Sequence, residues 1–289
     1  MASASPIAVA VLMLLASSSV GARPHTLTIS APYKGSSWSP YAQTYGGGCG
    51  SAHQLKNPFW FKTTGVAGFG ISASATKCPK TVGGIGTSAN EGAADSFTLS
   101  IPLKGFPAGN HTVTANWTMN IQASESALVK GLCPPPPAKS YYTSSTCSAS
   151  AGVYMGFSSP SGSPALVDLN TGVWLSMNNR WGGYGNSIGN QSYMYNQTYC
   201  YSGSCSYSNY SNGAAGGFNG TQTYSFNWSA TGSNALNTSH HYVIVITLGA
   251  NLYADVTSDP LGYPTVHASA IFNLGSATNN WKLNFIQVI

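Results

Sequence analysis

A serine between two glycines is the most specific chemical motif in the sequence. Gly185-Asn-Ser187-Ile-Gly189 fits the Gly-x-Ser-x-Gly pattern of serine hydrolases, and Asp255 or Asp259 and then His267 follow in a suitable order. That chemistry requires the serine on a sharp turn between a buried strand and a helix. Gly, Asn and Tyr flank Ser187 without a helical pattern, so the sequence argues against a serine hydrolase. We assign no catalytic residue from the sequence.

Histidines and carboxylates are the other groups that could act chemically. His240 and His241 are consecutive, and consecutive residues of a strand point to opposite faces, so we expect them to flank the start of a strand rather than bind one metal ion. The six carboxylates are dispersed, and only Asp95 and Glu125, on adjacent predicted strands, are candidates for a glycosidase pair. The sequence predicts no metal and no cofactor.

Tyrosines are concentrated in one segment that is rich in Gly, Asn and Ser. Aromatic rings can stack on sugar faces while Asn and Ser donate hydrogen bonds, so the segment is a candidate carbohydrate surface; cross-strand stabilisation and an unspecific surface ribbon are the alternatives. We expect an exposed loop or ribbon here. The candidate ligand residues are Tyr184, Tyr193, Tyr195, Tyr199, Tyr201, Tyr207 and Tyr210.

The chain contains eight Asn-x-Ser/Thr sequons, and six of them fall between residues 190 and 237. A glycan requires a solvated Asn, so this half would carry a sugar-coated face. Asn116 and Asn227 each precede a tryptophan within a strand pattern, and both must face outward to be modified. The predicted glycosylation sites are Asn110, Asn116, Asn190, Asn196, Asn209, Asn219, Asn227 and Asn237.

The N-terminus has the outline of a signal peptide. An apolar run over residues 7–16 precedes small residues and the first charge at Arg23, which predicts cleavage after Ala22 and an ectodomain over residues 23–289; an uncleaved anchor is the alternative. No later apolar run has membrane length. We therefore expect an extracellular or cell-surface protein without a transmembrane span in its mature chain.

Six cysteines remain after the predicted cleavage site, and disulfides persist outside the cytoplasm. Fifteen pairings of six cysteines are possible. Their spacing favours three neighbouring pairs, and zinc ligation is the alternative, although no Cys-x2-Cys spacing occurs. The predicted disulfides are Cys49 with Cys78, Cys133 with Cys147, and Cys200 with Cys205.

Charged residues make up only 6% of the chain, so uncharged polar groups must keep it soluble. The net charge of +5 comes from scattered lysines rather than a basic cluster, which argues against nucleic acid as a partner. Acid denaturation reflects carboxylates with depressed pKa values, and there are few carboxylates here. Adaptation to acidic surroundings is one hypothesis, and drift toward a polar surface is the other.

Period-two apolar patterns and turn residues predict an all-β fold. The expected strands cover residues 26–30, 96–101, 111–117, 172–177, 223–228, 242–248, 251–256, 265–274 and 281–288. Residues 123–130 form the best helical window, but it is short. We predict one or more antiparallel β-sandwiches with long disulfide-closed loops and almost no helix after the signal peptide.

Residues 96–123 and 223–256 share a weak similarity of strand, turn and histidine position. This similarity suggests two related lobes that meet near residues 131–150, beside the proline-rich stretch after Cys133. A single large domain, in which hairpins merely look alike, is the alternative.

Short strings at 131–134, 196–201 and 239–245 resemble uncharacterised, sequon-rich secreted proteins of acid- and heat-loving archaea. The resemblance extends over most of the mature chain, implies an extracytoplasmic setting and transfers no functional residue. The sequence therefore predicts a secreted or cell-surface structural or interaction protein without catalysis, whose partners are glycans or other surface proteins. An extracellular carbohydrate-binding module is the alternative, and an exported hydrolase is third. Exposed sheet edges would also allow self-assembly.

Overall fold

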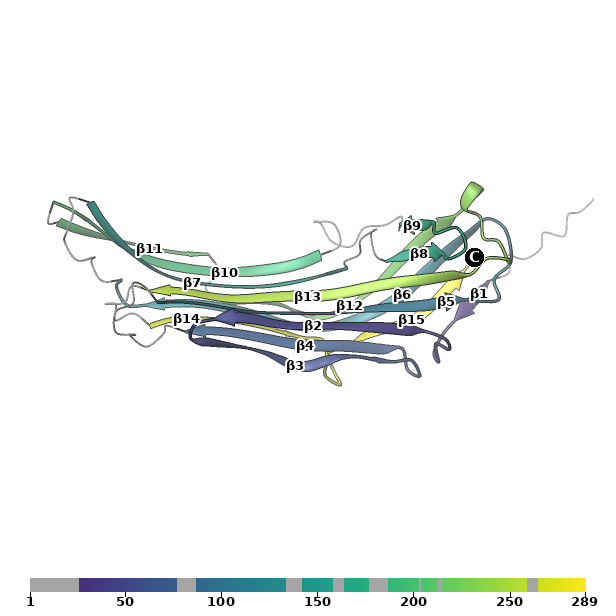
Figure 1. Cartoon of the computed structure of the whole chain (residues 1–289), viewed down its shortest axis with the longest axis horizontal. Helices are drawn as coiled ribbons and strands as arrows, with labels where there is room; N and C mark the ends of the chain where they lie inside the picture. The colour runs from purple at the N-terminus through teal and green to yellow at the C-terminus, as the bar shows by residue number, and fades with distance from the viewer. Residues whose placement is uncertain are drawn as a thin grey trace, which may run out of the picture.

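The protein is an elongated sandwich of two antiparallel sheets whose strands follow the long axis (Figure 1). The structure, a computed structural model, describes residues 26–76, 87–133, 142–157, 164–176, 187–202, 204–212, 215–258 and 265–289. Within these ranges the only helical element is the 3-10 turn Gly232–Asn234, and no helix could span a bilayer. The predicted all-β, antiparallel sandwich is confirmed.

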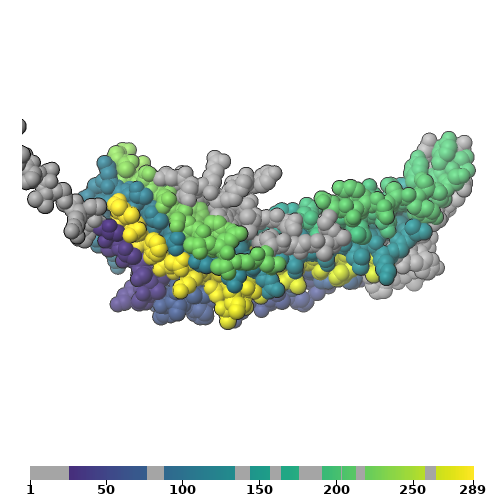
Figure 2. All heavy atoms as spheres, turned by 180° about the vertical axis from the view of Figure 1, so that it is seen from behind, coloured from purple at the N-terminus to yellow at the C-terminus, as the bar shows by residue number. Residues whose placement is uncertain are grey.

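The first sheet, sheet A, has β14 and β15 one after the other between β4 and β6. β3 and β12 are its long edge strands, and β1 pairs with the end of β15. Figure 2 views the molecule from this side, with β14 and β15 in yellow. Its strands are β1 (Leu27–Ile29), β3 (Gly50–Phe61), β4 (Val66–Thr76), β6 (His111–Lys130), β12 (Ala215–Ala230), β14 (Thr265–Asn273) and β15 (Trp281–Val288).

The second sheet, sheet B, has the order β11-β10-β7-β13-β5-β2, so β11 and β2 form its edges. A short hairpin of β8 and β9 pairs with β13 beyond the end of β7. Its strands are β2 (Ser37–Gly47), β5 (Thr87–Leu103), β7 (Tyr142–Phe157), β8 (Ala165–Asp168), β9 (Trp174–Ser176), β10 (Ser187–Tyr201), β11 (Ser204–Asn212) and β13 (Tyr242–Ser258).

Strict alternation of side-chain burial explains the length of the central strands. In β6, every second residue from Val113 to Val129 is buried, and the residues between them are polar or partly exposed. The predicted strand at 111–117 therefore extends to Lys130. The window at 123–130 is not helical, because its alanines fall at alternate positions that face sheet B.

The core changes character along the long axis. One half contains large rings, among which Trp117 stacks on Phe226 at 4.2 Å and Trp281 contacts Phe97 at 5.8 Å between ring centroids. The other half is lined mainly by alanines: Ala73, Ala75, Ala89, Ala93, Ala123, Ala127, Ala149, Ala151, Ala254, Ala268 and Ala270. Three buried carboxylates also lie in this half: Glu91, Asp95 and Glu125.

Two of the three predicted disulfides are present. Cys133, just after β6, is bonded to Cys147 on β7 and so links the two sheets. Cys200 is bonded to Cys205 across the turn between β10 and β11. Cys49 is also oxidised, whereas Cys78, its predicted partner, lies outside the described residues.

Other expected strand boundaries also differ from the structure. The strands expected at 242–248 and 251–256 are one strand, β13, because Gly249 continues the ladder; a side chain there would approach Ser96 Cβ to 3.0 Å. The described part of the tyrosine-rich segment, which we expected as an exposed loop or ribbon, is a ribbon, since β10 and β11 form a hairpin at the edge of sheet B.

Strands on either side of residues 131–150 pair with each other in both sheets. β5 pairs with β13, and β6 pairs with β12, so the two segments with weak internal similarity lie side by side. The described residues form one sandwich with a continuous buried core.

A tyrosine-lined face on sheet B

The outer face of sheet B is polar and carries many tyrosine rings. Because inward positions of β7 and β13 hold alanines and aliphatic residues, the alternate positions must face solvent. Most of these outward positions hold Ser, Thr, Gly, Asn or Gln. Tyrosines interrupt them on five of the strands, at Tyr41, Tyr45, Tyr154, Tyr193, Tyr195, Tyr199, Tyr201, Tyr210 and Tyr253.

Two of these rings pack flat against the sheet over glycines of the neighbouring strands. Tyr45 pairs with Gly92, and Tyr253 pairs with both Gly92 and Gly152. A Cβ atom on Gly92 would come within 2.3 Å of the Tyr45 ring, and one on Gly152 within 2.4 Å of the Tyr253 ring. Only a residue without a side chain leaves this space.

A groove of about 340 Å³ crosses this face between Tyr41 and Tyr154. Small residues form its floor: Ala94, Ser96, Gly156, Gly249 and Ala250. The two tyrosine rings are 53% and 42% exposed, so a ligand in the groove could contact both. This volume lies within the range of about 300–1,000 Å³ that is usual for small-ligand pockets.

Hydrogen bonds hold the aromatic rings beside the groove in place. The Tyr45 hydroxyl donates to Asn251 Oδ1 at 3.0 Å, and the Tyr154 hydroxyl donates to Gln191 Oε1 at 3.3 Å. Tyr154 also stacks on Tyr253, with ring centroids 6.4 Å apart and planes 16° apart. The rings therefore form a row across β2, β13 and β7.

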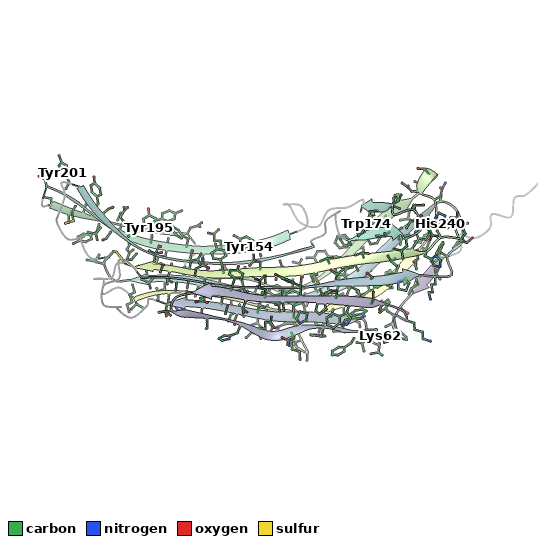
Figure 3. All side chains as sticks on the ribbon, viewed as in Figure 1. Lys62, Tyr154, Trp174, Tyr195, Tyr201 and His240 are labelled. Carbon is green, nitrogen blue, oxygen red and sulfur yellow. A yellow bond between two sulfur atoms is a disulfide. The ribbon has the colours of Figure 1, made fainter. Side chains whose placement is uncertain are left out.

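A second aromatic cluster lies on the β10–β11 hairpin. Tyr195 contacts Tyr193 and Tyr210, each at 5.6 Å between centroids. In Figure 3, Tyr154, Tyr195 and Tyr201 follow one another along the molecule toward the tip of the hairpin. Tyr207 pairs with the buried Thr198, so it lies on the other side of the hairpin. Tyr184 lies outside the described residues.

Sequence reasoning found the tyrosines of the hairpin but missed the groove and four rings that belong to the same face: Tyr41, Tyr45, Tyr154 and Tyr253. Tyr41 and Tyr45 are four residues apart, a spacing that places them on one side of a strand and could have signalled the face. Tyr154 and Tyr253 are far apart in sequence, and only strand pairing joins them.

The strands of sheet B contain no Lys or Arg in the part of the chain that the structure describes. Glu91 and Asp95 point inward, so Asp255 is the carboxylate that its long strands present on the outer face. Burial raises the pKa of Asp255, and its Oδ1 is buried without a hydrogen-bond partner. Burial and the Asp255 charge raise the pKa of Tyr45. The face therefore offers neutral hydroxyl and amide groups to a ligand, and Asp255 is the acidic group among them.

The predicted carboxylate pair lies inside the sandwich. β5 and β6 are neighbours in sequence but belong to opposite sheets, and both Asp95 and Glu125 point into the core. Burial raises the pKa of Asp95 to about 7. The backbone N–H of Gln43 lowers this pKa, but by less than burial raises it. Burial also raises the pKa of Glu125, whose Oε1 accepts a hydrogen bond from Ser192 at 3.4 Å. Their exposed fractions of 1% and 3% leave no access for a polysaccharide.

The groups of the apparent hydrolase motif do not meet. Ser187 begins β10, so a strand follows it where a nucleophile elbow needs a helix. Asp255 faces outward on sheet B and His267 faces outward on sheet A. Asp259 lies outside the described residues.

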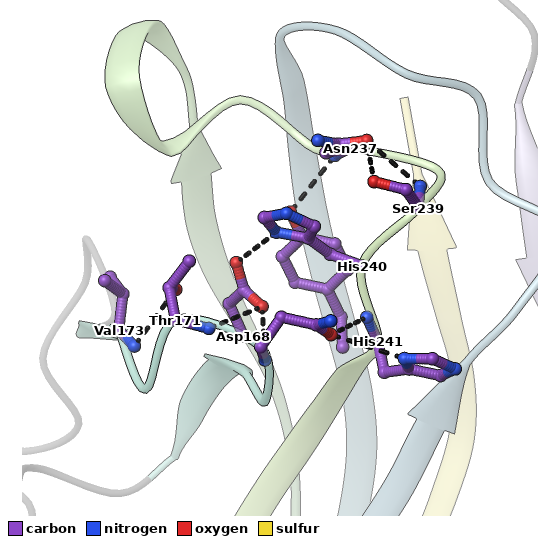
Figure 4. A network of polar contacts seen from close by, with 9 residues as sticks. Asp168, Thr171, Val173, Asn237, Ser239, His240 and His241 are labelled. Carbon is purple, nitrogen blue, oxygen red and sulfur yellow. Dashed lines mark hydrogen bonds and ion pairs between the residues drawn. The ribbon is translucent and has the colours of Figure 1, made fainter.

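The consecutive histidines precede β13, as predicted, and anchor the β8–β9 hairpin (Figure 4). His240 Nδ1 is 2.7 Å from Asp168 Oδ2, and the backbone N–H of Asn170 donates to Asp168 Oδ1 at 2.9 Å. The pKa of Asp168 is lowered, because these hydrogen bonds outweigh its desolvation. The His241 N–H donates to Asn170 Oδ1 at 2.8 Å. Both oxygens of Asp168 are thus engaged in fixing loops.

No protein-family model matches this chain, and neither a curated protein nor a solved structure shows significant similarity to it.

Proposed function

We propose that this chain is an exported interaction protein that binds neutral carbohydrate on the outer face of sheet B. The groove between Tyr41 and Tyr154 carries the proposal, because two exposed rings flank a floor made mostly of small residues. A sugar ring offers apolar C–H faces to aromatic rings and hydroxyls to the surrounding polar groups. Asn251 and Gln191, already in contact with tyrosine hydroxyls, provide amides at the rim.

Charge distinguishes the expected ligand class. An anionic polysaccharide would meet the Asp255 carboxylate and no lysine or arginine on these strands. A neutral chain loses no ionic hydration and can follow the tyrosines from the groove along the hairpin. The protein's role is then adhesion or structure at a surface rather than cleavage of the chain.

An extracellular location agrees with the covalent structure. Two disulfides are formed, and cross-links of this kind persist mainly in oxidising compartments. We propose that the N-terminal segment over residues 1–22 directs export and that exposed sequons carry glycans. Asn209, Asn219 and Asn237 are exposed. Asn116 and Asn227 are on the outer face of sheet A, and the tryptophan that follows each of them is buried on the inner face.

Binding to a panel of neutral and uronic-acid polysaccharides tests the ligand class. The Tyr41→Ala and Tyr154→Ala variants should each reduce affinity for a neutral polymer by about tenfold or more, as loss of a central aromatic contact does. Tyr207→Ala is the matched control, since this ring is 54% exposed but on the other side of the hairpin. Preference for the acidic polymers, or equal loss in all three variants, would refute the proposal.

A further inference from the structure

The sandwich has four long edge strands, and sheet edges ordinarily need protection from pairing with another chain. β3 is protected by its sequence and shape: it contains Lys56 and Pro58, and its register with β4 shifts twice between Gln54 and Phe59. Charges, proline and irregular register are all features that discourage strand addition. This edge of sheet A is therefore unsuited to pairing.

The edges formed by β11 and β12 carry sequons. Asn209 lies on β11, and Asn219 and Asn227 lie on β12. Two further sequons lie beside β12, although they are distant from it in sequence. Asn116 Nδ2 donates to Ser225 Oγ at 2.8 Å, and Asn110 Oδ1 accepts from the Gly232 N–H at 3.0 Å. Glycans at these positions would cover one long side of the sandwich.

β2, on the opposite side, has neither kind of protection. All eleven of its residues are exposed, and the sequence Ser-Trp-Ser-Pro-Tyr-Ala-Gln-Thr-Tyr-Gly-Gly contains no charge and no sequon. Pro40 is its single discouraging residue, and it lies near the start. No strand pairs with the outer edge of β2 among the residues that the structure describes.

We propose that β2 pairs in antiparallel fashion with β2 of a second copy of this chain. A two-fold interface places the same segment on both sides, so any charge in it would oppose a like charge near the axis. The uncharged β2 meets this requirement, whereas β3 with Lys56 does not. Because this pairing is isologous, it closes as a dimer and does not propagate.

The dimer would join two tyrosine-lined faces into one. Tyr41 and Tyr45 are on β2 itself, and Tyr41 forms a wall of the groove. The grooves of the two copies would then flank the shared edge. The pairing does not depend on carbohydrate binding, and either proposal can fail alone.

Light scattering coupled to size exclusion tests the pairing on the full mature protein. Wild type should have twice the mass of one chain, and Ala42→Lys/Thr44→Lys should weaken association by about tenfold or more, because like charges would meet at the interface. These positions alternate with Tyr41, Gln43 and Tyr45, so the tyrosine face and its carbohydrate affinity should be retained. Ser208→Lys on β11 is the matched control and should remain dimeric.

A cysteine scan locates the interface independently of charge. Ala42→Cys, or the same change at Gln43 or Thr44, should form a disulfide between two copies at the position nearest the axis, and Ser208→Cys should not. A monomeric wild type at high concentration, open filaments, or cross-linking only through β11 would overturn the proposal. A dimer that survives the double lysine variant would also overturn it.

Discussion

Burial in the core changes the acid–base chemistry of Asp95. Its side chain is 1% exposed in the alanine-lined half of the core, and burial raises its pKa from the ordinary value of 3.8 to about 7. Burial raises the pKa values of Glu125 and Asp255 as well. Burying a protonated carboxyl group costs less free energy than burying a carboxylate. These three residues therefore stabilise the folded state more at acidic pH than at neutral pH.

Thermal stability should therefore increase toward acidic pH. Asp95 binds its proton more tightly in the folded state than in the unfolded state, so its contribution is complete below about pH 4 and is lost as pH rises through about 7. The melting temperature should fall by on the order of 5 °C across that window, measured by circular dichroism. Maximum stability at neutral pH would contradict this expectation.

Asp95→Asn should flatten the pH profile, because an amide mimics the protonated acid and does not titrate. The matched control is Asp168→Asn, whose wild-type pKa is lowered by its contacts with His240 and backbone N–H groups. Loss of Asp168 should lower the melting temperature at neutral pH and leave the acidic end unchanged. Identical profiles for the two variants would show that Asp95 is not responsible.

Gly152 tests whether ring position matters to binding. In Gly152→Ala the new Cβ would lie 2.4 Å from the Tyr253 ring, so the ring must move away from the sheet. Because that ring is at the surface and stacks on Tyr154, we expect weaker carbohydrate binding with a small change in stability. Titration calorimetry and a melt on the same sample would separate the two effects.

Among the elements, the two disulfides within the described residues stabilise different parts of the fold. Cys133 and Cys147 are buried and join β6 in sheet A to β7 in sheet B, whereas Cys200 and Cys205 close a turn within one sheet. The first closes the longer loop, so the entropy model assigns it a larger effect, about 3 kcal/mol for a loop of about 15 residues.

Replacing both members of a pair by serine should reveal this difference. The Cys133→Ser/Cys147→Ser variant should lose more stability in urea unfolding than Cys200→Ser/Cys205→Ser, because it also places hydroxyls in an apolar site. Equal losses would mean that the link between the sheets has no special role.

The strands differ in how far they could be predicted from sequence. β15 has the bounds that its pattern indicated, and β6, β12 and β14 were recognised because large apolar residues alternate with polar ones. β2, β3, β4, β7, β8, β10 and β11 were not among the expected strands. In β2, β10 and β11, Gly, Ser, Asn and Tyr alternate without a contrast in hydropathy. Their strand state depends on pairing with neighbours, which a local pattern cannot indicate.

At the scale of the whole molecule, charge separates between the layers. Lys56, Lys130 and Lys282 lie on strands of sheet A, whose one acidic residue among the described strands is the buried Glu125. The described strands of sheet B contain acidic residues and no lysine. Figure 3 shows Lys62 on the side away from Tyr154, Tyr195 and Tyr201. Lysines that are scattered in the sequence thus lie on one sheet of the sandwich. The tyrosine face on the other sheet has no positive charge on its strands and suits an uncharged partner.

The candidate site could be predicted only in part for the same reason. The hairpin tyrosines are contiguous in sequence, and Tyr193, Tyr195, Tyr199, Tyr201 and Tyr210 do share one face. The groove is built from β2, β5, β7 and β13, whose pairing brings together residues more than 200 positions apart. Such a site has no local signature.

Hydroxyl-radical footprinting of the tyrosines, with and without a bound neutral polysaccharide, tests the central claim most directly. Tyr41, Tyr154 and Tyr195 should lose reactivity when the polymer is bound, because it would cover their rings. Tyr207, equally accessible but on the other side of the hairpin, should keep its reactivity. Unchanged labelling of Tyr41 and Tyr154, or protection centred on Tyr207, would contradict carbohydrate binding on the outer face of sheet B.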